Sequence, residues 1–138
     1  MCFDKEDFKT YLSMIQEVIS RMANNSFLVK GWAITIISAI LSFAAAKKLN
    51  PSIYFMAATV TIAFCIIDCF YLRTEKLYRN LYKKVVNEGL EDLSQVRFFD
   101  LDISNCKDKN TRFINIFFAN SIWPLYLTIL IGILFIAL

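Results

Sequence analysis

The sequence has no histidine, and it has only three glycines and two prolines. Histidine is the usual general base and metal ligand near neutral pH, so its absence removes the common hydrolase and metalloenzyme arrangements. A glycine-rich phosphate loop needs clustered glycines, and the three in this chain are scattered. We therefore expect a protein that is not an enzyme and that uses no metal or other cofactor.

Four cysteines are present, and none forms the C-x-x-C pair typical of zinc sites. Cys65 and Cys69 lie in or just beyond an apolar run, where free cysteine packs like a small apolar residue. We expect all four, Cys2 and Cys106 included, to be reduced.

Long apolar runs are abundant, because 57% of the residues are hydrophobic, against about 45–50% in soluble domains. Residues 31–46 and 51–67 carry no charge, and only Lys47-Lys48-Leu49-Asn50 separates them. A membrane span needs about 20 residues in a helix, so the sequence predicts a transmembrane helical hairpin over 27–72. The uncharged run 113–138 predicts a third transmembrane helix, which Pro124 could kink.

The first 26 residues combine charges with apolar residues at helical spacing: Phe8, Tyr11, Leu12, Ile15, Val18, Ile19 and Met22. This pattern predicts an amphipathic helix over 1–26. Its polar face is acidic as well as basic, which favours packing against protein over lying on anionic lipid. We expect a break at 24–26, with Ser26 as the N-cap of the first span.

The second span should continue as a helix to residue 86 and end near Gly89, within a charged segment over 73–112. Five cations share one face of that helix: Arg73, Lys76, Arg79, Lys83 and Lys84. They could touch anionic lipid, or they could form a phosphate-binding surface with Tyr78 and Tyr82 available for base stacking. Residues 99–103 alternate like a short strand or turn.

Small and polar residues form a stripe along the first span: Gly31, Thr35, Ser38, Ser42 and Ala46. Such a stripe favours close helix packing, and it could instead line a pore. Asp68 is the ionisable residue nearest to a span interior. It could belong to an ion path or to a buried pair, or it could be an interfacial acid that pairs with Lys30 or a later basic residue.

Lysine and arginine are distributed unevenly about the spans. Four precede the first span and nine lie in 73–112, whereas the 47–50 turn has two. The positive-inside rule therefore predicts a multi-pass protein with a cytoplasmic N-terminus, in the inner membrane if the cell is bacterial.

Two segments, Arg21–Trp32 and Asp68–Tyr82, resemble small membrane proteins of bacterial antiviral-defence loci, in particular the membrane effectors of Hailong-type systems. The resemblance covers about residues 17–85, and the third span agrees only in hydropathy. It implies a homo-oligomer, a tetramer or larger, that acts as a channel-like effector. It further implies control by an oligonucleotide second messenger such as oligodeoxyadenylate, made by a partner nucleotidyltransferase and holding the effector closed.

Two hypotheses follow. In the first, an antiphage effector opens an ion path that depolarises the host membrane, the cations of the basic helix meet phosphates, and Asp68 biases the path toward cations. In the second, the chain is a non-enzymatic membrane anchor or scaffold whose basic helix binds anionic lipid. In both, the fold class is all-α: three transmembrane helices, an N-terminal amphipathic helix and a cytoplasmic helical extension.

Overall fold

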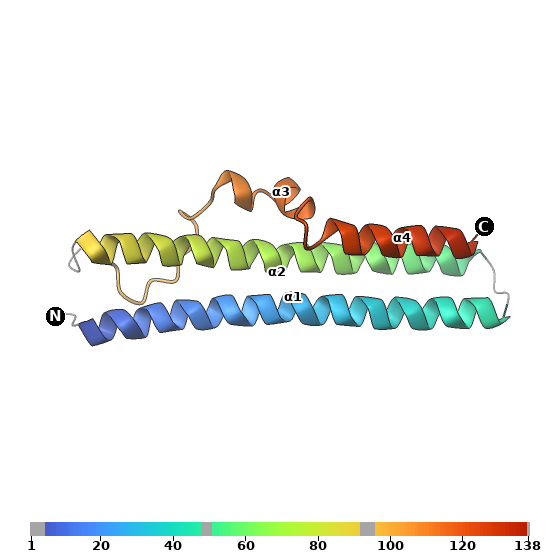
Figure 1. Cartoon of the computed structure of the whole chain (residues 1–138), viewed down its shortest axis with the longest axis horizontal. Helices are drawn as coiled ribbons and strands as arrows, with labels where there is room; N and C mark the ends of the chain where they lie inside the picture. Colours follow the sequence, from blue (N-terminus) through green and yellow to red (C-terminus); the bar gives the residue numbers. More distant parts are fainter. Residues whose placement is uncertain (1–4, 48–50, 92–95, 138) are drawn as a thin grey trace.

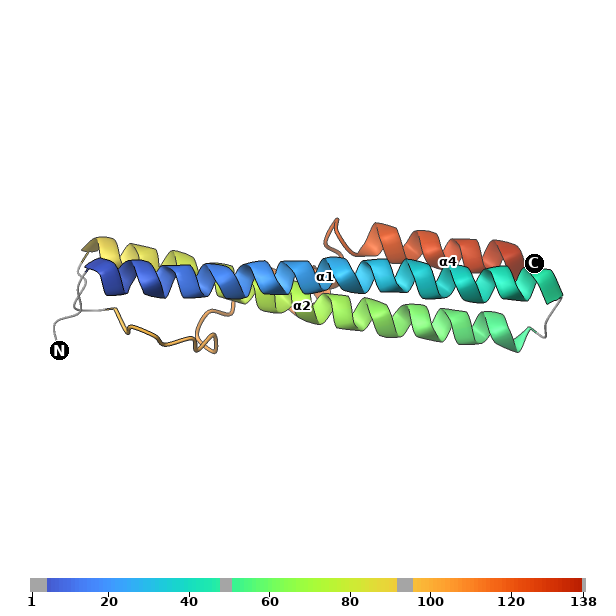
Figure 2. The same ribbon diagram turned by 90° about the horizontal axis from the view of Figure 1, so that it is seen from below.

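The computed structural model describes residues 5–47, 51–91 and 96–137. Two long helices form its body, α1 (Lys5–Lys47) and α2 (Ser52–Glu91), and they run antiparallel and side by side (Figures 1 and 2). Their 43 and 40 residues correspond to lengths of about 65 and 60 Å at 1.5 Å per residue. The all-helical prediction is confirmed, and no strand occurs in these described ranges. Of the short strand or turn expected at 99–103, the structure has a turn at 98–99, where the Asp100 N–H donates to the Arg97 carbonyl at 3.4 Å.

The predicted break at residues 24–26 is wrong, because α1 continues through it. Asparagine and serine cost a helix only a few tenths of a kcal/mol, and contact with α2 on both sides of this point outweighs that cost. Ser26 is therefore an interior helix residue, and the expected domain 1–26 is not separate from the hairpin. α2 likewise continues past residue 72, as predicted, and ends at Glu91, two residues beyond Gly89.

Gly89 does not end α2; it lies inside the helix, where its lack of a side chain allows close packing. A Cβ atom at this position would lie 2.3 Å from the nearest atom of the Phe8 ring. The absence of a side chain thus lets the start of α1 and the end of α2 approach closely.

The chain after α2 returns along the hairpin through an irregular segment, a short 3-10 helix η2 (Lys109–Thr111) and a one-turn helix α3 (Phe113–Phe117). The last helix, α4 (Trp123–Ala137), packs mainly against α2 and ends at the same end of the molecule as the start of α2 (Figure 1). The expected single helix over 113–138 is wrong. A turn interrupts it, closed by the Ile122 N–H donating to the Ala119 carbonyl at 2.9 Å.

Pro124 explains where α4 begins. It lies in the first helical turn, where its missing N–H costs no intrahelical hydrogen bond, so it starts the helix and does not kink it. The 15 residues of α4 reach about 22 Å, less than the roughly 30 Å of a bilayer core.

Two core clusters divide the molecule. In the charged half (α1 up to Asn25, α2 from Arg73 and residues 96–108), the core contains Tyr11, Ile15, Leu81, Val85 and Val96. In the apolar half (α1 from Phe27, α2 up to Leu72, and α4), the core contains Ala33, Ile37, Ala57, Cys65, Cys69, Tyr126 and Ile133, with Ile116 and Ile122 joining it from outside these helices. Tyr11 and Ile15 are buried, which confirms that the first part of α1 packs against protein.

Candidate functional site

Asp68 is the centre of a buried polar cluster where α1, α2 and α4 meet. Its side chain is fully buried, and the Lys30 Nζ lies 2.7 Å from Oδ2 and 2.8 Å from Oδ1. The Ser26 hydroxyl donates to Oδ1 and accepts from Lys30 Nζ at 2.8 Å. The Tyr126 hydroxyl lies 3.3 Å from Oδ2 and also 3.4 Å from the Phe64 carbonyl oxygen. One carboxylate therefore joins three helices.

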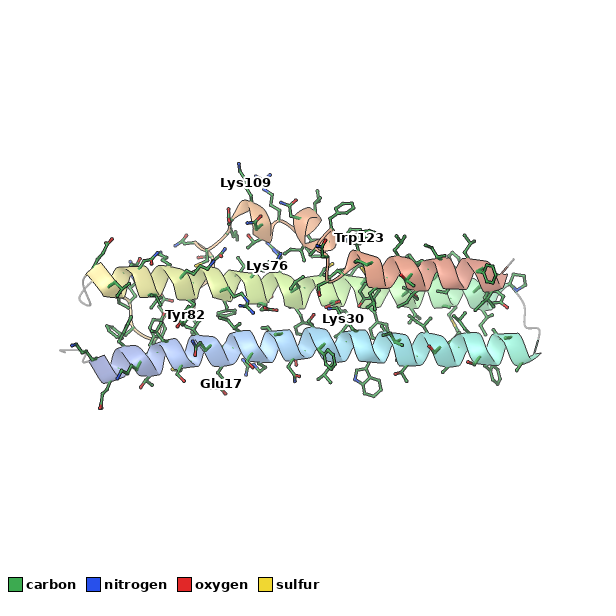
Figure 3. All side chains as sticks on the ribbon, in the orientation of Figure 1. Glu17, Lys30, Lys76, Tyr82, Lys109 and Trp123 are labelled. Atoms are coloured by element: carbon green, nitrogen blue, oxygen red, sulfur yellow. The ribbon has the colours of Figure 1, made fainter. Side chains whose placement is uncertain are left out.

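The helical repeat explains how α1 contributes two of these groups. Ser26 and Lys30 are four residues apart, so they occupy one face of α1. Figure 3 shows Lys30 in the space between α1 and α2. Tyr126 reaches the same point from the first turn of α4, because the turn before Trp123 brings that helix against α2.

The cluster is balanced in charge, with one ammonium facing one carboxylate. Removing both charges from water costs several kcal/mol, which the mutual attraction and the added hydrogen bonds offset. Removing one partner alone leaves an uncompensated buried charge. The pairing of Asp68 with Lys30, one of the alternatives for this residue, is thus confirmed, and the cluster fixes the three helices relative to one another.

The small-residue stripe faces the other way. Gly31, Thr35, Ser38, Ser42 and Ala46 are all exposed, whereas Ala33, Ile37 and Ala44 form the buried face of the same part of α1. At 100° per residue the two faces are about 150° apart. A Cβ atom at Gly31 would meet nothing within 4 Å. The stripe therefore lies on the side of α1 opposite the face that carries Ser26 and Lys30 toward Asp68.

Three of the five predicted phosphate-binding cations make contacts within the chain. The Arg73 Nε donates to the Thr111 carbonyl at 3.0 Å and ties η2 to α2. Arg79 pairs with Glu75 at 2.8 Å, and Lys84 approaches Glu88 at 3.8 Å. Within the described residues, Lys76 and Lys83 have no ion-pair partner.

The two tyrosines of the basic helix lie in the helix interface. Tyr78 and Tyr82 pack against the core of the charged half, and the Tyr82 hydroxyl accepts from the Gln16 amide at 3.1 Å. Both rings are therefore partly covered by the core, and base stacking on them stays a prediction.

A cavity of about 300 Å³ lies beside this core, between the hairpin and residues 97–106. Glu88, Asp100 and Asp102 line it together with Lys84 and Arg97, so its acids outnumber its bases, an arrangement that repels phosphate. The Tyr11 hydroxyl donates to the Asp100 carbonyl at its edge.

Three groups around this cavity have shifted pKa values. Burial, with smaller contributions from the carboxylates of Asp100 and Glu88, raises the pKa of Tyr11 to about 12. Burial also raises the pKa of the Cys106 thiol, which stays protonated at neutral pH. The hydroxyl and N–H of Ser104 donate to Asp102 and lower the pKa of its carboxyl group.

Sequence reasoning missed Ser26 and Tyr126 as partners of Asp68. The spacing of Ser26 and Lys30 on one helical face could have indicated the first. Nothing local indicated Tyr126, since its position depends on the turn before α4. Among the described residues, no group of three His, Cys, Asp or Glu side chains could hold a metal ion.

These features define the chain as an all-helical protein built on an elongated hairpin, with two helices that are long and apolar enough to cross a membrane. Comparisons with protein-family models, curated proteins and solved structures gave no match to this chain.

Proposed function

We propose that this chain is the subunit of an oligomeric membrane effector of bacterial antiphage defence, which opens an ion path through the inner membrane under the control of an oligonucleotide. The apolar half would lie in the bilayer as a multi-pass segment. The charged half, with the N-terminus, would lie in the cytoplasm. The resemblance to Hailong-type effectors supplies the defence role and the oligonucleotide class.

Membrane insertion is supported by the apolar side chains on the outside of the subunit. In the most apolar 18-residue stretch of each helix, only 17% of the residues of α1 and 28% of those of α2 are buried. The core helices of a soluble protein are mostly buried. Trp32, Phe55 and Phe135 are 61%, 78% and 83% exposed. Lipid chains would cover such a surface at no hydrophobic cost. The end of α1, the start of α2 and the end of α4 share one end of the molecule, which is compatible with the predicted orientation (Figure 1).

The observation that carries the proposal is the exposed stripe on α1. In lipid, small residues let helices of different subunits approach closely, and their hydroxyl groups can face water when several copies surround a path. The stripe residues are exposed, and they lie on the side of α1 opposite its buried residues Ala33, Ile37 and Ala44. A path would therefore form between copies in a closed ring, and the Asp68 cluster would keep each subunit rigid behind it.

Oligonucleotide control would act on the charged half. Lys76 and Lys83 are the cations of the basic helix without an internal ion pair in the described residues, so they are the strongest candidates for phosphate contacts. A partner nucleotidyltransferase would supply the ligand, for which oligodeoxyadenylate is the natural first probe.

The exposed stripe is tested by assembly and conductance. Ser38→Leu should reduce the oligomer seen in mild detergent and the current in a planar bilayer, because a bulky side chain prevents close approach. Ser38→Ala keeps the position small and should retain both. Ala63→Leu adds the same bulk at an exposed position of α2 and should also retain both. A monomeric wild-type protein without conductance would refute the proposal.

The ligand is tested by calorimetry with oligodeoxyadenylate at two salt concentrations. Wild type should bind more weakly at higher salt, because each phosphate contact releases counterions. Lys76→Glu with Lys83→Glu should abolish binding, whereas Lys9→Glu with Arg21→Glu on α1 should not. Binding that is equal in both double variants would remove the basic helix as the ligand site.

The anchor or scaffold remains a second candidate because Arg73, Arg79 and Lys84 are engaged within the subunit. A basic helix whose charges stabilise its own fold needs no nucleotide ligand. A scaffold would assemble and bind anionic lipid, but it would give no conductance in a planar bilayer.

A further inference from the structure

An apolar groove of about 370 Å³ lies between α2 and α4, below the end of α3. One face of α2 from Thr61 to Ile66 forms one wall, and one face of α4 from Trp123 to Leu130 forms the other. Phe117 and Phe118 close the end of the groove beside α3, which we call its upper end. The groove is separate from the Asp68 cluster, although the Tyr126 ring contributes to both.

The lining of the groove presents no hydrogen-bonding group. The Thr61 hydroxyl donates to the Ala57 carbonyl at 2.8 Å, within its own helix. The Tyr126 hydroxyl points to Asp68 and the Phe64 carbonyl. A polar occupant would lose its hydrogen bonds with water and gain none here, so the groove fits hydrocarbon.

The rim of the groove is continuous with the exposed apolar surface. Ile62, Leu127 and Phe118 on the rim are 53%, 46% and 66% exposed. A lipid chain could therefore enter sideways without crossing water. A cavity of about 150 Å³ already holds benzene, and ligand sites span roughly 300–1,000 Å³, so this groove has room for a segment of an acyl chain.

Two cations lie on the segment that leads through α3 to the upper end of the groove. Lys109 and Arg112 are exposed on the segment that leads through α3 to Phe117, and within the described residues neither has an ion-pair partner. The nearby carboxylate, Asp108, accepts the Lys109 backbone N–H as the cap of η2. A phosphate group above the groove would meet these cations.

We propose that this groove is a phospholipid-binding site, which takes one acyl chain of a lipid from the cytoplasmic leaflet and holds its phosphate near Lys109 and Arg112. The proposal rests on the membrane insertion in the proposed function, and it needs neither the ion path nor the oligonucleotide. An occupied groove supports the Tyr126 ring from the side opposite Asp68, and it thereby holds α4 against α2.

Retention of lipid by the purified full-length protein tests this site. After extensive washing in maltoside detergent, bound phospholipid is extracted and measured by phosphate analysis and mass spectrometry. Wild type should keep tightly held phospholipid. Ile62→Phe with Leu127→Phe fills the groove and should lose it. The matched pair, Ile34→Phe with Leu134→Phe, adds the same bulk at exposed positions outside the groove and should keep it.

A second comparison tests the headgroup contact. Lys109→Glu with Arg112→Glu should lower the retained phospholipid, whereas the same charge change at Lys9 and Arg21, far from the groove, should not. Wild type without retained phospholipid, or a groove-filled variant that retains as much as its matched pair, would overturn the site. If wild type holds no lipid and the groove-filled variant dissociates the oligomer, the groove binds a second copy of the chain. That result would also overturn the phospholipid site.

Carbonate extraction separates this failure from that of the proposed function. Protein released from membranes by carbonate would refute insertion itself. Protein that stays in the membrane but carries no lipid after washing would refute the groove alone.

Discussion

In the charged half, α1 and α2 bury apolar side chains and expose their charges, whereas in the apolar half they bury a charged pair beside an apolar core and expose apolar side chains. The charged half buries Ile15, Leu81 and Val85 and leaves Lys83 in solvent. The apolar half buries the Lys30–Asp68 pair and leaves Trp32 exposed. The same pair of helices thus has two kinds of interior, each suited to different surroundings.

Different interactions hold the two halves together. Hydrophobic burial drives association in water, and it explains the core of the charged half. In lipid, apolar side chains gain little from burial, and polar contacts and close packing associate helices. The cluster around Asp68 supplies such polar contacts to α1, α2 and α4, so we expect the two halves to respond differently to substitution.

The largest expected effect comes from breaking the buried pair. Asp68→Ala should lower the free energy of unfolding in detergent by about 3–5 kcal/mol, because the Lys30 ammonium loses its partner. Thermal unfolding followed by circular dichroism measures this change. The double variant Lys30→Ala with Asp68→Ala should be more stable than Asp68→Ala alone. Equal stability of the two variants would show that the unpaired Lys30 ammonium is not what destabilises Asp68→Ala.

A cavity in the other half should cost somewhat less and act locally. Ile15→Ala should destabilise by about 2–4 kcal/mol through lost burial and the cavity that remains. Hydrogen exchange should rise in the charged half and stay unchanged around Ala33 and Ala57. The neighbouring substitution Met14→Ala, at an exposed position, serves as the control. Equal loosening of both halves would contradict their independence.

Tyr11→Phe should have the smallest effect, about 1 kcal/mol, because one hydrogen bond to Asp100 is lost. The native state raises the pKa of Tyr11 from 10.0 to about 12, so its contribution is complete below pH 10 and is lost as the pH rises toward 12. Wild type should therefore lose more stability than Tyr11→Phe over that window, as measured by unfolding at fixed pH values. A parallel decline in both proteins would exclude Tyr11 as the cause.

The sequence predicted what periodicity and charge determine. The hairpin, the helical continuation of α2 and the packing face at Tyr11 and Ile15 are confirmed, because each depends on a repeat of apolar residues along one helix. The continuity of α1 at Ser26 was missed, since a local capping signal was outweighed by contacts with Asp68 from a distant part of the chain. The interruption before α4 was missed because uncharged composition does not reveal the turn at 118–122.

The candidate site was predicted only in part, for the same reason. Lys30 was one of the alternatives considered for Asp68, beside an ion path and a later basic residue, and the structure shows the pair with Lys30. Tyr126 was not, because its contact depends on how α4 docks. Arg73 contacts Thr111 and Arg79 pairs with Glu75. The spacing of the cations along the helix does not show whether they make such contacts or form a free basic face.

The central claim, that copies of this chain meet through the small-residue stripe, is tested most directly by cross-linking in native membranes. Ser38→Cys and Ala63→Cys are compared in a background with the four native cysteines replaced, using a short bismaleimide. We expect cross-linked oligomers from Ser38→Cys and none from Ala63→Cys. Ser38→Cys that stays monomeric, while a lipid-soluble maleimide labels it as readily as Ala63→Cys, would show that the stripe faces lipid and would contradict the account.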